Sequence, residues 1–243
     1  MRAWVFAGRV RKEILRDPMS LLFGIGLPLV LIAAIQLMAR AIPGMSGNFG
    51  IDHFAPGMAV FAQSFLALFL GMLVSGDRGS AFLTRLFASP MRDGDYLAGY
   101  GLPMLLIALV QGAVCFALAL CFGMQATPRL LLALVALLPA AMLFVALGLL
   151  IGSCLSGPQV GGAASILVNV AAWLSGVWFP LDLIGGAFRT VCYALPFAHA
   201  VDAVKAVLSG DWAAVLPHLA WVVAYAAVCF ALAVWLFRKK RVQ

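Results

Sequence analysis

Over residues 130–154 the chain reads LLLALVALLPAAMLFVALGLLIGSC, a run without one charged side chain. A bilayer core of about 30 Å is crossed by roughly 20 apolar residues in a helix. Backbone amides find no water partners in lipid, and a period-two alternation is absent, so the run predicts a transmembrane α-helix rather than a barrel strand. By the same criterion, further spans are predicted at residues 19–39, 54–76, 97–122, 160–179 and 213–237.

The composition points to the same class of protein. Hydrophobic residues make up 65% of the 243-residue chain and charged residues only 10%. A soluble core could not bury so much apolar surface, so we expect an all-α membrane protein that forms one transmembrane domain over residues 1–243. No predicted span carries a charge at its centre. Proton and ion pathways need ionisable groups inside the membrane, so the energy for transport is expected to come from another source.

The distribution of Lys and Arg predicts the orientation. Twelve of the 16 lie on the side that holds both termini and the connection after residue 76, and four lie on the other side. This bias predicts that both termini are cytoplasmic. The net charge of +7 adds an attraction to anionic membrane lipids, which are expected partners. Because the charges flank membrane spans, no nucleic-acid partner is expected.

Residues 1–17 form the first of three amphipathic segments outside the predicted spans. Phe6, Val10 and Ile14 share one face, and the basic residues gather opposite, with Arg11 as the exception. This pattern predicts a helix that lies along the cytoplasmic surface of the membrane. Arg16-Asp17-Pro18 is expected to end it, because Pro disfavours helix in the residue before it.

The two other amphipathic segments lie on opposite sides of the membrane. Residues 78–90 predict a short cytoplasmic helix with an apolar ridge and a basic flank, which suits docking onto a partner or onto the lipid surface. Residues 180–210 contain two predicted helices that are too short to cross. They precede the last span, and we expect them to be re-entrant pieces in the outer leaflet.

Small residues and prolines mark special positions inside the spans. Gly148 and Gly152 form a small-x-x-x-small surface, which predicts the close approach of another helix. Pro28, Pro103 and Pro139 interrupt the hydrogen-bond ladders of their spans, and each is a candidate kink.

Taken in order, these motifs make the chain similar to the membrane subunits of type-2 ATP-binding-cassette exporters, the ABC-2 permeases. Family members typically begin with a basic amphipathic helix that runs into R-D-P. Their first cytoplasmic loop carries R-E-x-G-T-x-x-x-L-x-x-S-P, from which this chain departs because Gly79 replaces the usual Glu, Ala81 the usual Gly and Phe82 the usual Thr. Later patterns are S-G-x-x-F-P and L-P-x-x-H. The matching residues are Arg16-Asp17-Pro18, then Arg78, Leu86, Ser89 and Pro90, then Ser175–Pro180, and finally Leu195–His199.

The resemblance implies a half-transporter of the bacterial plasma (inner) membrane. Two permease chains, either identical or paralogous, would form the pathway, and ABC ATPase subunits would drive export from the cytoplasmic side. This chain has no G-x-x-x-x-G-K-[ST] sequence, so ATP and Mg²⁺ are expected on the partner, and no catalytic residue, cofactor or metal is expected here. The predicted coupling residues are Arg78, Phe82, Arg85, Leu86, Ser89 and Pro90.

The resemblance also places the second and fifth spans near the axis of the permease dimer. One face of each span carries aromatic or neutral polar residues, which suits an amphipathic, lipid-like or drug-like cargo, or a glycan; ordinary packing is the alternative interpretation. The external segment is expected to form an outer gate in an alternating-access cycle. The predicted pathway residues are Phe61, Phe65, Phe69, Ser165, Asn169 and Trp173, and the predicted gate residues are Phe179, Pro180, Pro196 and His199.

Other classes of protein remain open from the residues alone. An ATP-independent channel or secondary transporter needs internal symmetry and buried charge, which the pattern does not show. A non-transporting membrane scaffold would share the same spans. An intramembrane hydrolase would need Ser175 within reach of His199 or His218. His199 and Asp202 are two metal-type ligands, and two ligands do not make a site.

Overall fold

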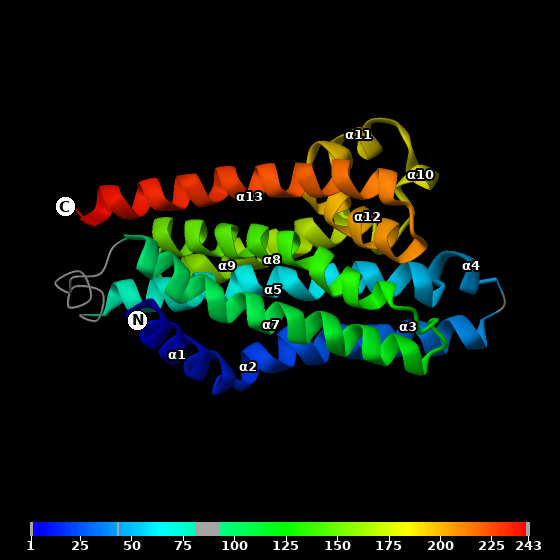
Figure 1. Ribbon diagram of the computed structural model, residues 1–243, viewed down its shortest axis with the longest axis horizontal. Coiled ribbons are helices and arrows are strands. Elements are labelled where there is room, and N and C mark those ends of the chain that lie inside the picture. The colour runs from blue at the N-terminus through cyan, green and yellow to red at the C-terminus, as the bar shows by residue number, and fades with distance from the viewer. Residues whose placement is uncertain (1, 43, 81–92, 242–243) are drawn as a thin grey trace.

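The structure is a computed structural model that describes residues 2–42, 44–80 and 93–241. All regular elements in these ranges are helices, and the long ones run lengthwise beside one another (Figure 1). Both ends of the chain lie at one end of the bundle, where α5 ends and α7 begins, and α10 to α12 lie toward the opposite end. The elements are α1 (Arg2–Leu15), α2 (Pro18–Leu21), the π-helical η1 (Leu22–Gly26), α3 (Leu27–Ala41), α4 (Ser46–Phe49), α5 (Ile51–Gly79), α7 (Asp93–Cys121), α8 (Arg129–Cys154), α9 (Gly157–Leu174), α10 (Leu181–Ile184), α11 (Gly186–Ala194), α12 (Pro196–Ser209) and α13 (Trp212–Arg241).

The expected all-α membrane architecture is confirmed. Among the described residues, five helical stretches are long and apolar enough to cross a membrane, or six if the bent pair α11 and α12 counts as one span. The two helices of that pair meet at 83°. The five stretches are Pro18–Ala41, Ile51–Gly79, Gly94–Cys121, Arg129–Cys154 and Trp212–Leu236.

The helix α9 differs from the predicted span at residues 160–179. It begins at Gly157, where Ser156 and Gln159 form a capping box, and it ends at Leu174 because Gly176 turns the chain with a φ of 73°. Its 18 residues extend over about 27 Å, but α9 is not among the stretches that are long and apolar enough to cross a membrane. The last five residues of the predicted span therefore belong to a turn and not to the helix.

A local break separates α1 from the first span, as Arg16-Asp17-Pro18 predicts. The side chain of Asp17 caps α2 by accepting a hydrogen bond from the backbone N–H of Met19 at 3.1 Å. The π-helical turn that follows was not predicted. Pro28 has no N–H to offer the carbonyl of Gly24, and the Gln111 side chain of α7 donates to that oxygen instead, at 2.9 Å.

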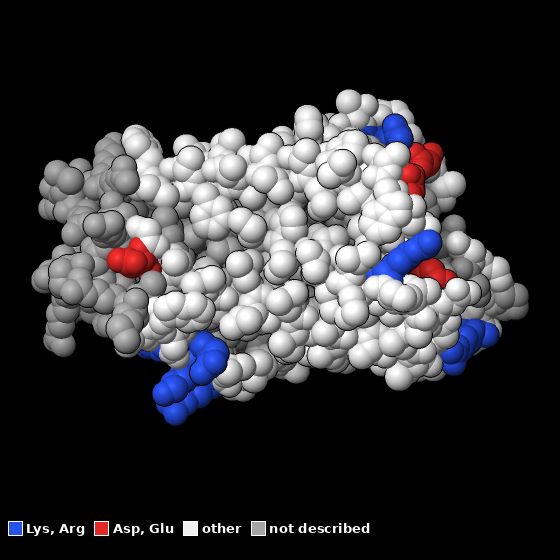
Figure 2. All heavy atoms as spheres, in the orientation of Figure 1, with Lys and Arg blue, Asp and Glu red and all other residues white. Residues whose placement is uncertain are grey.

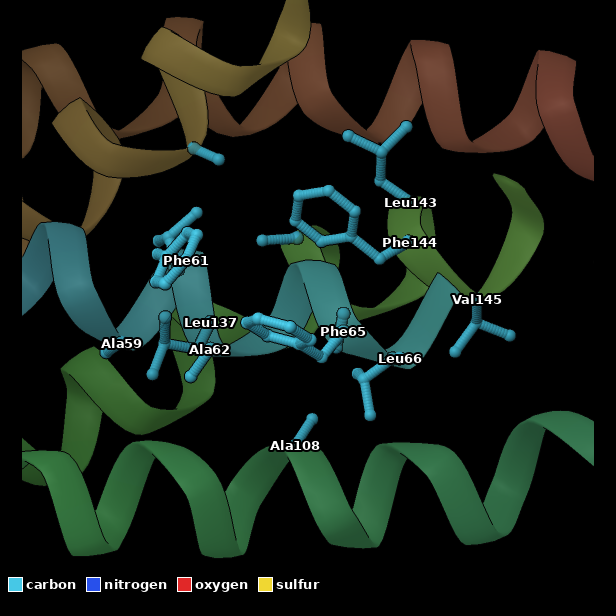
Figure 3. Packing of buried hydrophobic residues seen from close by; sticks show 14 of the residues in the cluster. Ala59, Phe61, Ala62, Phe65, Leu66, Ala108, Leu137, Leu143, Phe144 and Val145 are labelled. Carbon is cyan, nitrogen blue, oxygen red and sulfur yellow. The ribbon is translucent and has the colours of Figure 1, made fainter. Parts of the chain in front are cut away.

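The core lies around α5, which is the most deeply buried of the candidate spans. Figure 3 shows Leu66 of α5 pointing toward α7, where Ala108 lies. The helices α5 and α8 approach each other closely, as Gly148 and Gly152 predict. A Cβ atom at Gly148 would lie 2.8 Å from the carbonyl oxygen of Ala67, and one at Gly152 would lie 2.6 Å from that of Gly71. The two backbones touch because neither glycine has a side chain.

Candidate functional site

A groove of about 320 Å³ lies between α5, α9 and the start of the first span. It brings together five of the six predicted pathway residues, from two helices about a hundred positions apart in the sequence. Phe69 does not line the groove, but its ring stacks on that of Phe65 with 6.1 Å between centroids. The lining residues are Phe23, Leu27, Phe61, Phe65, Leu68, Ser165, Val168, Asn169, Ala172, Trp173 and Trp178.

Aromatic rings make up most of one wall of this groove. Phe61 packs edge-on against Phe65 at 5.4 Å and against Trp178 at 6.4 Å, measured between ring centroids. The ring of Phe23, from the π-helical turn, stacks on Phe65 at 6.4 Å. The unpredicted π-helical turn therefore supplies an aromatic residue that spacing along α5 and α9 could not reveal.

Two neutral polar side chains of α9 face the same groove. The Asn169 amide donates to the carbonyl of Ser165 at 2.9 Å, one turn earlier in its own helix. The carboxamide oxygen of Asn169 has no hydrogen-bond partner among the described residues, although it can accept one. Ser165, Asn169 and Trp173 are exposed, and they also line a shallower hollow of about 460 Å³ on the outer face of α9. The groove thus opens onto a face that none of the described residues covers.

The predicted gate residues divide between two places at the outer end of the bundle. Phe179 stacks on Trp173 at 6.1 Å, so it borders the groove, and Pro180 follows it directly before α10. Pro196 is buried at the start of α12. His199 lies on α12 and pairs with His218 of α13, with 2.7 Å between their Nδ1 atoms. The structure thus brings Phe179, but not His199, into contact with a predicted pathway residue.

The contacts of His199 fit a neutral imidazole. The Nε2 of His199 lies 3.0 Å from the carbonyl oxygen of Tyr193, which only an N–H can approach. The Nδ1 of His199 is then an acceptor, and His218 donates to it. Burial lowers the pKa of His199 below 6.5, and His218 acts in the same direction, while the Tyr193 carbonyl and Asp202 oppose them. A proton on Nδ1 of His199 would remove the hydrogen bond between the rings.

We expect stability to fall on mild acidification because of this pair. As pH drops below 6.5, the unfolded state takes up a proton before the folded state does, so the free energy of unfolding decreases until the lower folded pKa is reached. The apparent melting temperature of the detergent-purified protein should fall between about pH 7.5 and 5.5. His199→Gln should reduce this dependence, while His53 remains in both proteins as a common background. An identical slope in the variant would show that His199 is not the source of this dependence.

A buried ionic cluster lies at the opposite end of the bundle, and the sequence did not reveal it. Asp77 is 5% exposed. Its two oxygens accept from the guanidinium of Arg9 at 2.8 and 3.0 Å, and the Tyr100 hydroxyl donates to it at 2.7 Å. Hydrogen bonding to Asp77 raises the pKa of Arg9, so the guanidinium stays charged. The cluster joins α1, α5 and α7. Asp77 directly follows the predicted span at residues 54–76, so the sequence predicts that it belongs to the cytoplasmic connection.

The neighbouring residue fixes the end of α5 to the end of α8. The Arg78 guanidinium donates to the carbonyl of Gly152 at 2.8 Å and to that of Leu155 at 3.3 Å, and it also contacts the carbonyl of Ser153. A cation at a helix C-terminus satisfies free carbonyls and complements the helix dipole. Of the predicted coupling residues, Arg78 therefore contacts its own chain, and the others, Phe82, Arg85, Leu86, Ser89 and Pro90, lie outside the described residues.

The residues of the alternative sites have other partners. The Ser175 hydroxyl donates to the carbonyl of Ala172 at 3.1 Å, one turn earlier, and His199 bonds to His218 and to Tyr193. Asp202 accepts from the Tyr193 hydroxyl at 2.7 Å. In the part of the chain that the structure describes, no group of three or more His, Cys, Asp or Glu residues could hold a metal ion.

A bundle with membrane-spanning helices, an aromatic groove and an amphipathic N-terminal helix has the architecture of a membrane permease. The chain belongs to the ABC-2 type transporter family, whose model matches residues 2–208. It is similar to Nodulation protein J of Rhizobium leguminosarum bv. trifolii, with 24% identity over 230 residues that cover 93% of this chain and 84% of the relative. The chain is thus an ABC-2 family membrane permease with a role in transport.

Proposed function

We propose that this chain is the membrane-spanning half of an ATP-driven exporter. Two permease chains, identical or paralogous, would pack around the uncovered face of α9, and separate ABC ATPase subunits would bind ATP and Mg²⁺ on the cytoplasmic side. The Lys and Arg bias supports an inner-membrane protein with cytoplasmic termini. Figure 1 supports this topology, because both termini lie at one end of the bundle.

The observation that carries the proposal is the continuity of α5. This single helix of 29 residues runs from the groove, at Phe61 and Phe65, to the fixed end at Asp77 and Arg78, directly before residues 81–92. A displacement of residues 78–90 by the ATPase would therefore move α5, a single helix that also lines the groove. Phe179, stacked on Trp173 at the other end, would open as α5 and α9 tilt.

The lining of the groove supports a class of cargo. Aromatic rings provide apolar contact, whereas Ser165 and Asn169 provide sparse hydrogen bonds without a charge. Such a lining suits an amphipathic, lipid-like or drug-like molecule, or a glycan that stacks its apolar face on aromatic rings. These residues are the proposed substrate contacts.

The coupling segment provides the test of this function. In vesicles that contain the permease and its ATPase, Leu86→Asp or Arg85→Glu should leave ATP hydrolysis intact and reduce transport by at least about tenfold. The reason is that the altered segment at residues 78–90 would no longer transmit the movement of the ATPase to α5. Leu86→Met keeps the apolar ridge and should behave like the unaltered protein. Lys239→Glu reverses a charge elsewhere on the same side and is the control for Arg85→Glu.

Unchanged transport in both coupling variants would refute the proposal that residues 78–90 couple the ATPase to α5. Transport without any ATPase would instead favour an ATP-independent channel or secondary transporter. Binding of an ATPase with no transport of any amphipathic probe would favour a scaffold subunit.

A further inference from the structure

A second groove, of about 230 Å³, lies between the interfacial helix α1 and the membrane-spanning helix α7, away from the aromatic groove. The wall that α1 provides includes a cation. The wall that α7 provides is entirely apolar. The lining residues are Trp4, Ala7, Gly8 and Arg11 of α1, and Leu102, Pro103 and Leu106 of α7.

Arg11 is the basic residue that did not fit the amphipathic pattern of α1. It lies on the same side of the helix as Trp4, Ala7 and Gly8 and lines the groove, and it also borders the charged surface of α1 that holds Lys12 and Arg16. Its guanidinium is exposed and has no hydrogen-bond or ion-pair partner among the described residues. Arg9, two positions earlier, bonds to Asp77 and to Glu13. The charge of Arg11 is therefore available to a ligand.

The rest of the groove has the properties of a site for one acyl chain. Leu106 is 54% exposed on a helix that is long and apolar enough to cross the membrane, so its side chain faces the hydrocarbon region. A Cβ atom built on Gly8 meets no atom within 4 Å, which leaves open space between the two helices. Trp4 is 70% exposed at the rim, and indole rings prefer the level of lipid headgroups. Figure 2 shows Lys and Arg atoms at the position of α1 beside a broad uncharged surface.

We propose that this groove binds a membrane phospholipid with an anionic headgroup. The planar guanidinium of Arg11 would hold the phosphate through paired N–H donors. Trp4 would lie beside the glycerol region, and one acyl chain would follow Leu102, Pro103 and Leu106. The bound lipid would fill the space beside Gly8 and add to the contacts that Phe6 and Tyr100 already make between α1 and α7. The proposal depends on neither the transport cargo nor the ATPase.

Lipid retention by the full-length protein tests this site. The purified chain is reconstituted in nanodiscs of mixed phosphatidylglycerol and phosphatidylcholine, extracted in mild detergent, and analysed by native mass spectrometry. The unaltered protein should retain phosphatidylglycerol in preference to phosphatidylcholine. Arg11→Gln should lower this retention about fivefold, the effect of one basic residue at a membrane surface. Gly8→Leu keeps every charge but fills the groove, and it should lower retention of both lipids.

Lys12→Gln is the matched control, because it removes the same charge from the same helix without touching the groove. Melting curves of each variant verify folding, which is expected to be intact because Arg11 has no hydrogen-bond or ion-pair partner among the described residues. Equal retention in Arg11→Gln and the unaltered protein would overturn the proposal, as would an equal loss in Lys12→Gln. Loss of a copurifying ATPase from Arg11→Gln, with lipid retention unchanged, would assign the residue to a protein partner instead.

Discussion

Asp77→Asn is expected to lower the free energy of unfolding by about 2–3 kcal/mol. The substitution keeps the shape of the side chain but leaves the guanidinium of Arg9 without its ionic partner in a site where Asp77 is 5% exposed. Breaking a fully buried pair costs about 3–5 kcal/mol, and the partial exposure of Arg9 reduces that figure. Tyr100 also loses a charged acceptor for its hydroxyl. The measurement is urea or thermal unfolding of the purified protein in detergent.

The control for this prediction is Asp52→Asn. Asp52 lies in the first turn of the same helix and is exposed, so the same change should cost little there. Arg9→Gln combined with Asp77→Asn should cost less than the sum of the single variants, because each removes the same interaction. Additive effects would contradict the view that the pair joins α1 to α5.

Gly152→Ala is expected to destabilise the protein by about 1–3 kcal/mol, although Ala is the better helix former. The added Cβ would lie 2.6 Å from the carbonyl oxygen of Gly71 and 3.1 Å from its Cα. These are backbone atoms of a neighbouring helix, which cannot rotate away as a side chain can. The closely packed pair α5 and α8 must separate, and the carbonyl of Gly152 that Arg78 binds must move with it.

Gly162→Ala provides a control of opposite sign. It lies inside α9, and an added Cβ there meets nothing within 4 Å. The gain in helix propensity should then stabilise the protein, by up to about 1 kcal/mol. Melting temperatures of both variants, measured in the same detergent, decide the matter. Stabilisation by both substitutions would mean that α5 and α8 are not in backbone contact.

Much of the fold could be predicted because lipid enforces simple rules. Apolar run length gives five of the six predicted spans, the break at Pro18 gives the end of α1, and the spacing of Gly148 and Gly152 gives a close helix contact. The aromatic groove followed from spacing as well, since Phe61 and Phe65 are one turn apart on α5. Its function as a pathway stays a prediction, as do the roles of the coupling and gate residues.

What the sequence did not reveal depends on partners that are distant along the chain. Asp77 reads as a loop residue until Arg9 and Tyr100 are brought to it by the packing of α1 and α7. The π-helical turn depends on the Gln111 side chain of α7. Its amide donates to the carbonyl of Gly24, which Pro28 cannot do because it has no N–H. The end of α9 is set by Gly176, which turns the chain with a positive φ. A hydropathy profile does not detect such a turn, because the residues around it are apolar.

The most direct test of the central claim is transport in reconstituted vesicles. The tagged chain is purified from its native membrane together with any bound ATPase, and accumulation of a fluorescent amphiphile is followed with and without ATP. We predict accumulation only when the permease, the ATPase subunit and hydrolysable ATP are all present. Accumulation at the same rate in vesicles that contain this chain alone would contradict the account.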